Sequence, residues 1–188
     1  MNHLIAAALE SEVGHHFKGE NIVLTGVGKI NAAYALTKAL HTMKPAIVFN
    51  LGTAGSSRHA PGTVLICNRF YQRDMDASPL GFAAGVTPYS DVPEILEYGR
   101  TIEGYLPSLC GTGDNFNVAT QKKDAHCDAF DMEAYSLALV CKNENTPFIC
   151  VKYITDGADS EAAGKWIENL DAAAVALHKA YRDICRKI

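Results

Sequence analysis

The sequence predicts a three-layer α/β domain, with helices on both sides of a β-sheet. Short apolar runs rich in Val, Ile and Leu alternate along the chain with segments whose apolar residues recur every three or four positions. The first pattern is typical of buried strands and the second of amphipathic helices, and their alternation favours the α/β class. The chain has 188 residues, enough for one substantial core, so we expect residues 1–188 to form a single domain.

The composition argues against several classes of function. Apolar residues make up 48% of the chain and charged residues 20%, and the formal net charge of -4 does not favour binding to nucleic acid or to an acidic membrane. No apolar run reaches the roughly 20 residues of a membrane helix, and the chain does not start like a signal peptide. The six cysteines never form a Cys-x-x-Cys pair, which favours reduced thiols in the cytoplasm over disulfides or a metal site.

Three strands and one long helix are expected in the N-terminal part of the chain. The expected elements are a strand at 3–9, a polar helical segment from Glu10, a strand at 21–25, a helix reaching about residue 41, and a buried strand at 45–51. Glu10 and Glu12 directly follow the first strand. Acids suit the first turn of a solvated helix because they interact favourably with the helix dipole, and we favour this interpretation over the alternative of a functional site.

Two glycine turns follow the second and third strands. The segment 26–28, Gly-Val-Gly, enters a helix as phosphate cradles do, but the third glycine of the dinucleotide fingerprint and the end of a P-loop are missing. We therefore expect a tight turn there, and neither NAD nor another cofactor. The segment 52–56, Gly-Thr-Ala-Gly-Ser, is expected to be a turn that caps the third strand. Its small residues, Ala54 and Gly55 among them, would let a ligand approach the main chain closely.

The middle of the chain is its least regular part. A β run at 63–71 is followed by a Gly/Pro-rich segment, 72–93, which is longer than most ordered connections. We expect this segment to be a functional loop or a subunit contact. Within it, Arg73, Asp74 and Asp76 form either a solvated ion cluster or part of a site, and the sequence favours neither.

The remaining elements alternate between helix and strand. They are a short helix at 94–101, a strand at 108–112, a short helix at 119–125, a strand at 127–131, a helix from Glu133, a strand at 148–154 and a helical segment at 160–188. Phe116 lies just beyond a strand end, where its ring either joins the core or stacks on a planar ligand. Trp166 belongs to an apolar stripe of the last helix that is typical of packing.

Two acidic residues lie where catalytic groups are expected. In open α/β sheets, ligands bind at the carboxyl ends of the strands. Asp156 leaves the buried strand at 148–154, and Glu133 lies at the preceding strand-to-helix junction. These two carboxyl groups are therefore the first candidates for a site.

The residues around this pair resemble a known superfamily. Asp131-Met-Glu133, followed by Asp156 in Thr-Asp-Gly, is similar to the purine nucleoside phosphorylase / methylthioadenosine nucleosidase superfamily, as are the segments 26–33, 52–55 and 113–116. The similarity is closer to the nucleosidase branch, which hydrolyses 5′-methylthioadenosine and S-adenosylhomocysteine. It covers nearly the whole chain and implies one nucleoside phosphorylase-like domain, with a central mixed β-sheet flanked by helices.

The resemblance implies roles for three carboxylates. Asp156 matches the general acid that protonates the departing purine, which requires it to hold a proton near neutral pH. Glu133 matches the residue that accepts hydrogen bonds from the 2′- and 3′-hydroxyls of the ribose, and Glu12 the residue that positions the attacking water. Lys152 stands where the nucleosidases carry an arginine, which keeps the charge but loses the bidentate fork.

Other residues are implied to contact the nucleoside. Met132 would lie against the sugar and Phe116 would stack on the purine. Asn117 follows Phe116 where an apolar residue is more usual in the superfamily. The remaining residues expected to bind substrate are Ala54, Gly55 and Asp131.

Hydrolysis and phosphorolysis are the main alternatives for the reaction. The phosphorylases hold phosphate with arginines near the glycine turns, whereas here the first turn offers Lys29, and Glu10 and Glu12 would repel an anion. We therefore favour water over phosphate, with Arg58 and Arg73 as the remaining candidates for holding phosphate.

Two further alternatives concern the substrate and the class of function. The segments near 14–22 and 77–108 are shorter than in a typical nucleosidase, so a futalosine-type hydrolase stays open, as does a non-catalytic nucleoside-binding module. The expected partners are a purine nucleoside and water, or phosphate. The resemblance also implies a homodimer.

Overall fold

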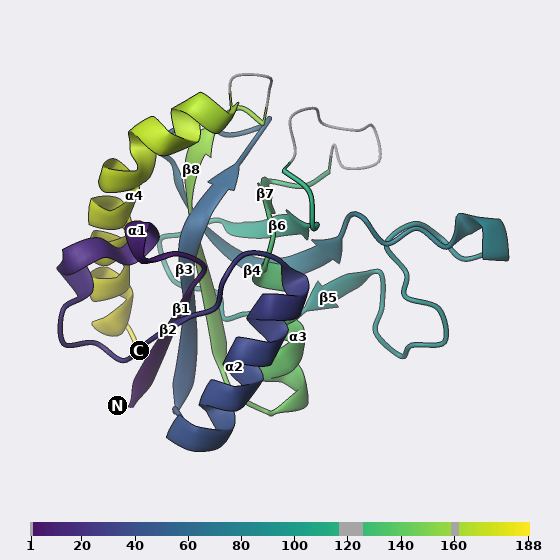
Figure 1. Ribbon diagram of the computed structural model, residues 1–188, viewed down its shortest axis with the longest axis horizontal. Helices are drawn as coiled ribbons and strands as arrows, with labels where there is room; N and C mark the ends of the chain where they lie inside the picture. Colours follow the sequence, from purple (N-terminus) through teal and green to yellow (C-terminus); the bar gives the residue numbers. More distant parts are fainter. Residues whose placement is uncertain (1, 117–125, 159–161) are drawn as a thin grey trace.

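The computed structural model has a mixed β-sheet with helices on both sides, as expected (Figure 1). It describes residues 2–116, 126–158 and 162–188. The strands in these ranges are β1 (His3–Ala7), β2 (Ile22–Leu24), β3 (Ile47–Gly55), β4 (Val64–Gln72), β5 (Ile95–Glu97), β6 (Pro107–Thr112), β7 (Ala129–Asp131) and β8 (Phe148–Asp156). The helices are α1 (Glu10–Val13), α2 (Lys29–Met43), α3 (Ala134–Asn143) and α4 (Ala162–Cys185), with short 3-10 helices η1 (Gly14–Phe17) and η2 (Ser78–Leu80).

Five of the strands close into a ring. β8 pairs in parallel with β3 and antiparallel with β4, β6 pairs in parallel with β4 and β7, and β7 returns to β3. β1 and β2 extend the sheet from β3, and β5 extends it from β4. In the last step of the ring, Gly55 at the end of β3 pairs with Phe130 of β7. This pairing brings the segments that carry Asp156 and Glu133 next to each other.

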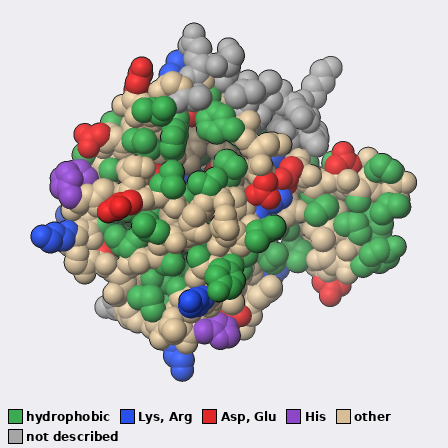
Figure 2. Space-filling model, in the orientation of Figure 1, with side chains coloured by type: hydrophobic (Ala, Val, Ile, Leu, Met, Phe, Trp, Pro, Cys, Tyr) green, Lys and Arg blue, Asp and Glu red, His purple; other side chains and the backbone are tan. Residues whose placement is uncertain are grey.

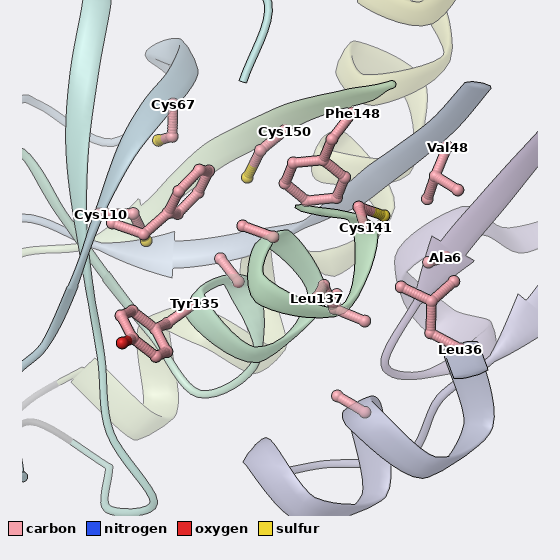
Figure 3. Packing of buried hydrophobic residues seen from close by; sticks show 14 of the residues in the cluster. Ala6, Leu36, Val48, Cys67, Cys110, Tyr135, Leu137, Cys141, Phe148 and Cys150 are labelled. Carbon is pink, nitrogen blue, oxygen red and sulfur yellow. The ribbon is translucent and has the colours of Figure 1, made fainter. Parts of the chain in front are cut away.

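Strand β8 shows why the core has two parts. Successive side chains of a strand point to opposite faces, and both faces of β8 are covered. Phe148, Cys150 and Ile154 belong to the cluster under α2 and α3, part of which is shown in Figure 3. The alternating residues Ile149, Val151 and Tyr153 belong to the cluster under η1 and α4.

The prediction of a short helix at 94–101 is wrong. Ile95–Glu97 form β5, which pairs antiparallel with β4. Leu96 is fully buried, and Gly99 lies so close to β4 that a Cβ atom there would be 2.7 Å from the Cα of Asn68. A segment this short has no clear period, so the free edge of β4 decides its conformation.

The predicted turn at 52–56 is also wrong. β3 continues through Gly55, beside β8, which extends to Asp156, with a register shift between Ala54 and Gly55. The strand can continue because β8 runs equally far beside it and satisfies its backbone hydrogen bonds. The small residues Ala54 and Gly55 therefore lie at the end of a strand and not in a turn.

Residues 73–94 form a protruding arm, at the right of Figure 1, whose regular structure is limited to η2. The irregular segment expected at 72–93 is thus confirmed, except that Gln72 still belongs to β4. The helix expected at 119–125 lies outside the described residues. Among those residues, no helix combines the length and apolar character needed to cross a membrane.

Candidate active site

A pocket of about 190 Å³ opens where the ends of β3, β7 and β8 meet α1 and α4. It collects residues that lie far apart in the sequence. The expected site residues in its lining are Glu12, Ala54, Gly55, Phe116, Asp131, Met132, Glu133 and Asp156. Asn117, the other expected residue, lies outside the described part of the chain. The side chain of Phe116 is 47% exposed, so it lies at the pocket and not in the core.

Asp156 is buried at the end of β8 and held from two sides. The Thr155 hydroxyl donates to its Oδ2 at 2.7 Å, and the Ala158 N–H donates to its Oδ1 at 2.9 Å. Gly55 of β3 lies directly beside it, because a Cβ atom at Gly55 would be 2.7 Å from Oδ1. The carboxyl group thus has one orientation, and any side chain at Gly55 would collide with it.

Glu133 lies between β7 and α3 and is only 8% exposed. The Gly28 N–H, from the turn before α2, donates to its Oε1 at 3.0 Å. Burial, followed by the negative charge of Asp131, raises the pKa of Glu133 to about 7, although Lys152 and the Gly28 N–H act in the opposite direction. Glu133 therefore changes charge near neutral pH.

Beneath Glu133 lies a buried ion pair. Lys152 Nζ is 2.8 Å from Asp131 Oδ2, and both side chains are almost completely buried. Burial alone would raise the pKa of Asp131, but Lys152, the Thr112 hydroxyl and the Ala134 N–H together hold it below its usual range. Asp131 lines the pocket, yet these partners occupy its carboxylate. Lys152, which interrupts the apolar strand predicted at 148–154, thus has its charge partner on β7.

Glu12 is also buried, which makes the interpretation as a solvated helical turn wrong for this residue. Its Oε1 accepts hydrogen bonds from the N–H and the hydroxyl of Thr53, both at 2.8 Å. Its Oε2 accepts from the N–H groups of Ala8 and Leu9, at 3.1 and 3.2 Å. The acid caps its own helix and also reaches β3. Glu10 is exposed, as that interpretation expected.

Trp166 was not expected in the site. Its indole Nε1–H donates to the Thr53 hydroxyl at 2.9 Å, and its side chain lines the pocket. Trp166 therefore donates a hydrogen bond to Thr53, whose N–H and hydroxyl in turn donate to Glu12. Nothing in the spacing of α4 distinguishes Trp166 from the packing stripe, because the difference depends on how α4 lies across the sheet.

The arm residues that the sequence left undecided have different positions. Arg73 is buried in the pocket lining and donates to the side chain and backbone oxygens of Asn115. Asp74 pairs with Lys29, outside the lining. Asp76 is exposed and accepts from the Ser78 N–H. Arg58 also lies outside the pocket lining and pairs with Asp128 at 3.4 Å.

The residues around the pocket supply acids and amides but no evident metal site. Across the described ranges, no three His, Cys, Asp or Glu side chains are arranged to hold a metal ion. The cations Lys152 and Arg73 are taken up by Asp131 and Asn115. Chemically, the arrangement can transfer a proton, bind hydroxyl groups and orient a water molecule.

Comparisons with known proteins identify the family to which this chain belongs. A family model described as Phosphorylase superfamily matches residues 11–186. The 5′-methylthioadenosine/S-adenosylhomocysteine nucleosidase of Anoxybacillus flavithermus is 30% identical over 182 residues, which cover 84% of this chain and 77% of the relative. The corresponding nucleosidase of Staphylococcus aureus is 30% identical over 178 residues, covering 84% and 78%.

Solved structures with a similar fold include two from Helicobacter pylori. A mutant nucleosidase with 5′-methylthioadenosine in its active site has a TM-score of 0.90 at 18% identity, covering 100% of this chain and 99% of that chain. A futalosine hydrolase has a TM-score of 0.88 at 19% identity, covering 99% and 97%. At these identities the likeness extends to the fold alone. Because the family model spans most of the sequence, and the relatives at 30% identity cover 84% of it, the chain belongs to the phosphorylase superfamily.

Proposed function

We propose that this protein is a purine nucleosidase, which hydrolyses the N-glycosidic bond of a 5′-modified purine nucleoside such as 5′-methylthioadenosine or S-adenosylhomocysteine. The observation that carries the proposal is the grouping of three buried carboxyl groups, Glu12, Glu133 and Asp156, around one pocket with different partners. The names of the relatives at 30% identity support the choice of substrate.

The first role is proton donation to the base. Cleavage of the glycosidic bond leaves negative charge on the departing purine, which a carboxylic acid neutralises by giving its proton to N7. Asp156 would supply this proton, with the Thr155 hydroxyl and the Ala158 N–H fixing its orientation. Gly55, which has no side chain, lets β3 run close beside this carboxyl group without a collision.

The second role is stabilisation of the ribose, which becomes positively charged as the bond breaks. Ionised Glu133 would accept hydrogen bonds from the 2′- and 3′-hydroxyls and favour this charge. The Gly28 N–H already occupies one position on Oε1, so the remaining acceptor positions can face the sugar. Because the pKa of Glu133 is about 7, we expect kcat/KM to fall as the pH is lowered through 7.

The third role is orientation of the attacking water. Glu12 accepts four hydrogen bonds on its two oxygens, so its orientation is fixed. We infer that water binds at Oε1 in place of the Thr53 hydroxyl, which then keeps the hydrogen bond donated by Trp166. Water is favoured over phosphate because several acids surround the pocket, while Lys152, Lys29 and Arg73 all have partners in the protein.

Release of free base from a panel of nucleosides, with and without phosphate, tests this function. The panel contains 5′-methylthioadenosine, S-adenosylhomocysteine, adenosine, inosine and 5′-modified inosines. We expect phosphate-independent release, fastest from one of the two 5′-thio nucleosides. A strict requirement for phosphate would make the protein a phosphorylase, preference for 5′-modified inosines would favour a futalosine-type hydrolase, and no release would favour a binding module.

We also propose that the protein is a homodimer of one-domain subunits working in the cytoplasm. Large apolar side chains are exposed around the start of α2 and on the arm, and Figure 2 shows apolar side chains gathered on the arm. They are Val27, Ile30 and Tyr34 at the start of α2, and Leu80 and Tyr89 on the arm. Pairing of two subunits would bury such surfaces. A monomer by light scattering at micromolar concentration would contradict the dimer.

A further inference from the structure

Three charged side chains join the start of α2 to the ends of β4 and β6. Lys29 Nζ lies 2.5 Å from Asp74 Oδ1 and 3.7 Å from Asp114 Oδ2. None of the three side chains lines the pocket. The side chains of Lys29 and Asp74 are 17% and 21% exposed, whereas that of Asp114 is 45% exposed. The mechanism proposed above does not use it.

The two carboxylates of this cluster also accept hydrogen bonds from backbone N–H groups. Asp114 Oδ1 accepts the Lys29 N–H at 2.7 Å, and Asp74 Oδ2 accepts the Asp114 N–H at 2.8 Å. Gly28, at the N-cap of α2, has no side chain with which to cap the helix, and its φ is 93°. A Cβ atom at Gly28 would lie 3.1 Å from Asp114 Oδ1. Asp114 therefore supplies from another loop the cap that Gly28 lacks.

The neighbouring N–H group points into the site. Gly28 N–H donates to Glu133 Oε1 at 3.0 Å, while the next N–H along the chain, that of Lys29, donates to Asp114. Two consecutive amides of one turn are thus held by two carboxylates, one inside the pocket and one outside it. Loss of the contact between the Lys29 N–H and Asp114 would remove one of the two hydrogen bonds that fix this turn.

We propose that Asp114, held by Lys29 and Asp74, is a positioning residue for the ribose site, because it fixes the turn that keeps the Gly28 N–H on Glu133. This inference rests on the proposed function of Glu133 as the acceptor for the ribose hydroxyls. Asp114 acts through Gly28, and it does not itself touch the substrate.

The titration of Glu133 distinguishes this role from a simple effect of charge. Glu133 faces Asp131 on β7, Lys152 on β8, Glu12 on α1 and the Gly28 N–H. Removing the negative charge of Asp114 would by itself lower the pKa of Glu133. Losing the hydrogen bond from Gly28 would raise it, because that bond favours the ionised form. The two explanations predict opposite signs.

The test compares Asp114→Ala with Asp114→Asn, whose amide oxygen can still accept the Lys29 N–H. The carboxyl of Glu133 is followed by NMR in protein labelled with 13C at Glu Cδ, with the signal assigned through Glu133→Gln. In Asp114→Ala we expect the pKa of Glu133 to rise to roughly 8, as for loss of one hydrogen bond to a charged group. In Asp114→Asn it should stay at or below the parent value. An unchanged or lower pKa in the alanine variant would overturn the proposal.

Kinetics give the second measurement. In Asp114→Ala we expect kcat/KM for the ribonucleoside to fall about tenfold, mainly through KM, together with the preference over the 2′-deoxynucleoside. Asp114→Asn should retain most of both, and Asp91→Asn on the exposed arm should change neither. Equal losses on the two substrates would overturn the proposal, with circular dichroism checking that the variants fold. If the parent releases no base, the proposed function fails, and the NMR titration still decides whether Asp114 controls Glu133.

Discussion

Replacing Glu133 with glutamine should make the protein more stable above neutral pH while it lowers activity. The pKa of Glu133 in the folded protein is about 7, against 4.5 for an ordinary glutamate. The folded state therefore holds a proton that the unfolded state releases between these values, and the carboxyl group lowers the stability as the pH rises from 4.5 to 7. A difference of about 2.5 in pKa corresponds to about 3 kcal/mol.

Glutamine carries no charge and can keep the hydrogen bond that Gly28 donates to Oε1. In Glu133→Gln we therefore expect a free energy of unfolding close to that of the parent at pH 5 and up to about 3 kcal/mol higher at pH 8. The assay is urea denaturation at pH 5, 6, 7 and 8, at one protein concentration because of the expected dimer.

A matched control is Glu94→Gln, because Glu94 is exposed on the arm. It should leave the stability difference close to zero at every pH. A Glu133→Gln difference that does not change between pH 5 and pH 8 would refute the reasoning that Glu133 ionises at a cost in a buried site. The same variant should lose its preference for ribonucleosides over 2′-deoxynucleosides.

Three further substitutions test the site. Gly55→Ala places a Cβ atom 2.7 Å from Asp156 Oδ1 and 3.3 Å from Ala158 Cβ, so kcat should fall about a hundredfold and overpacking should cost about 1–3 kcal/mol of stability; retained kcat would show that Asp156 keeps its orientation. Lys152→Met leaves Asp131 buried without its cation and should destabilise the protein by about 3–5 kcal/mol in urea denaturation, and adding Asp131→Asn should recover part of this loss. Glu12→Gln places an amide against N–H donors and should cost about 1–3 kcal/mol of stability and roughly a hundredfold in hydrolysis rate; wild-type hydrolysis would exclude Glu12 from the reaction.

The sequence predicts most of the fold because apolar pattern and burial agree over its longer elements. β8 is an apolar run covered on both faces, and α2 and α3 begin and end close to the expected residues. The failures are short segments whose conformation depends on a neighbour. β5 forms because β4 offers a free edge, and β3 continues through Gly55 because β8 runs beside it. In both cases the neighbouring strand is separated from the segment by more than 20 residues of the sequence.

The sequence predicts the acidic residues of the candidate site better than it predicts the residues that surround them. Asp156 and Glu133 follow buried strands, which is where sheet geometry places ligands. The burial of Glu12 could not be inferred from spacing, because a helix dipole explains an acid at that position equally well. Trp166 and Arg73 enter the site only through the way α4 and the arm lie against the sheet. The sequence leaves two alternatives open for Arg73 and assigns Trp166 to packing, and no local signal decides either contact.

The most direct test of the central claim is the release of adenine from 5′-methylthioadenosine in phosphate-free buffer, by the parent protein and by Asp156→Asn. We expect the parent to release adenine together with free methylthioribose. The variant should still bind the nucleoside but be at least about a hundredfold slower, as for loss of a general acid. Full turnover by the variant would contradict the assignment of Asp156 as the acid, and the absence of release by the parent without phosphate would contradict the nucleosidase itself.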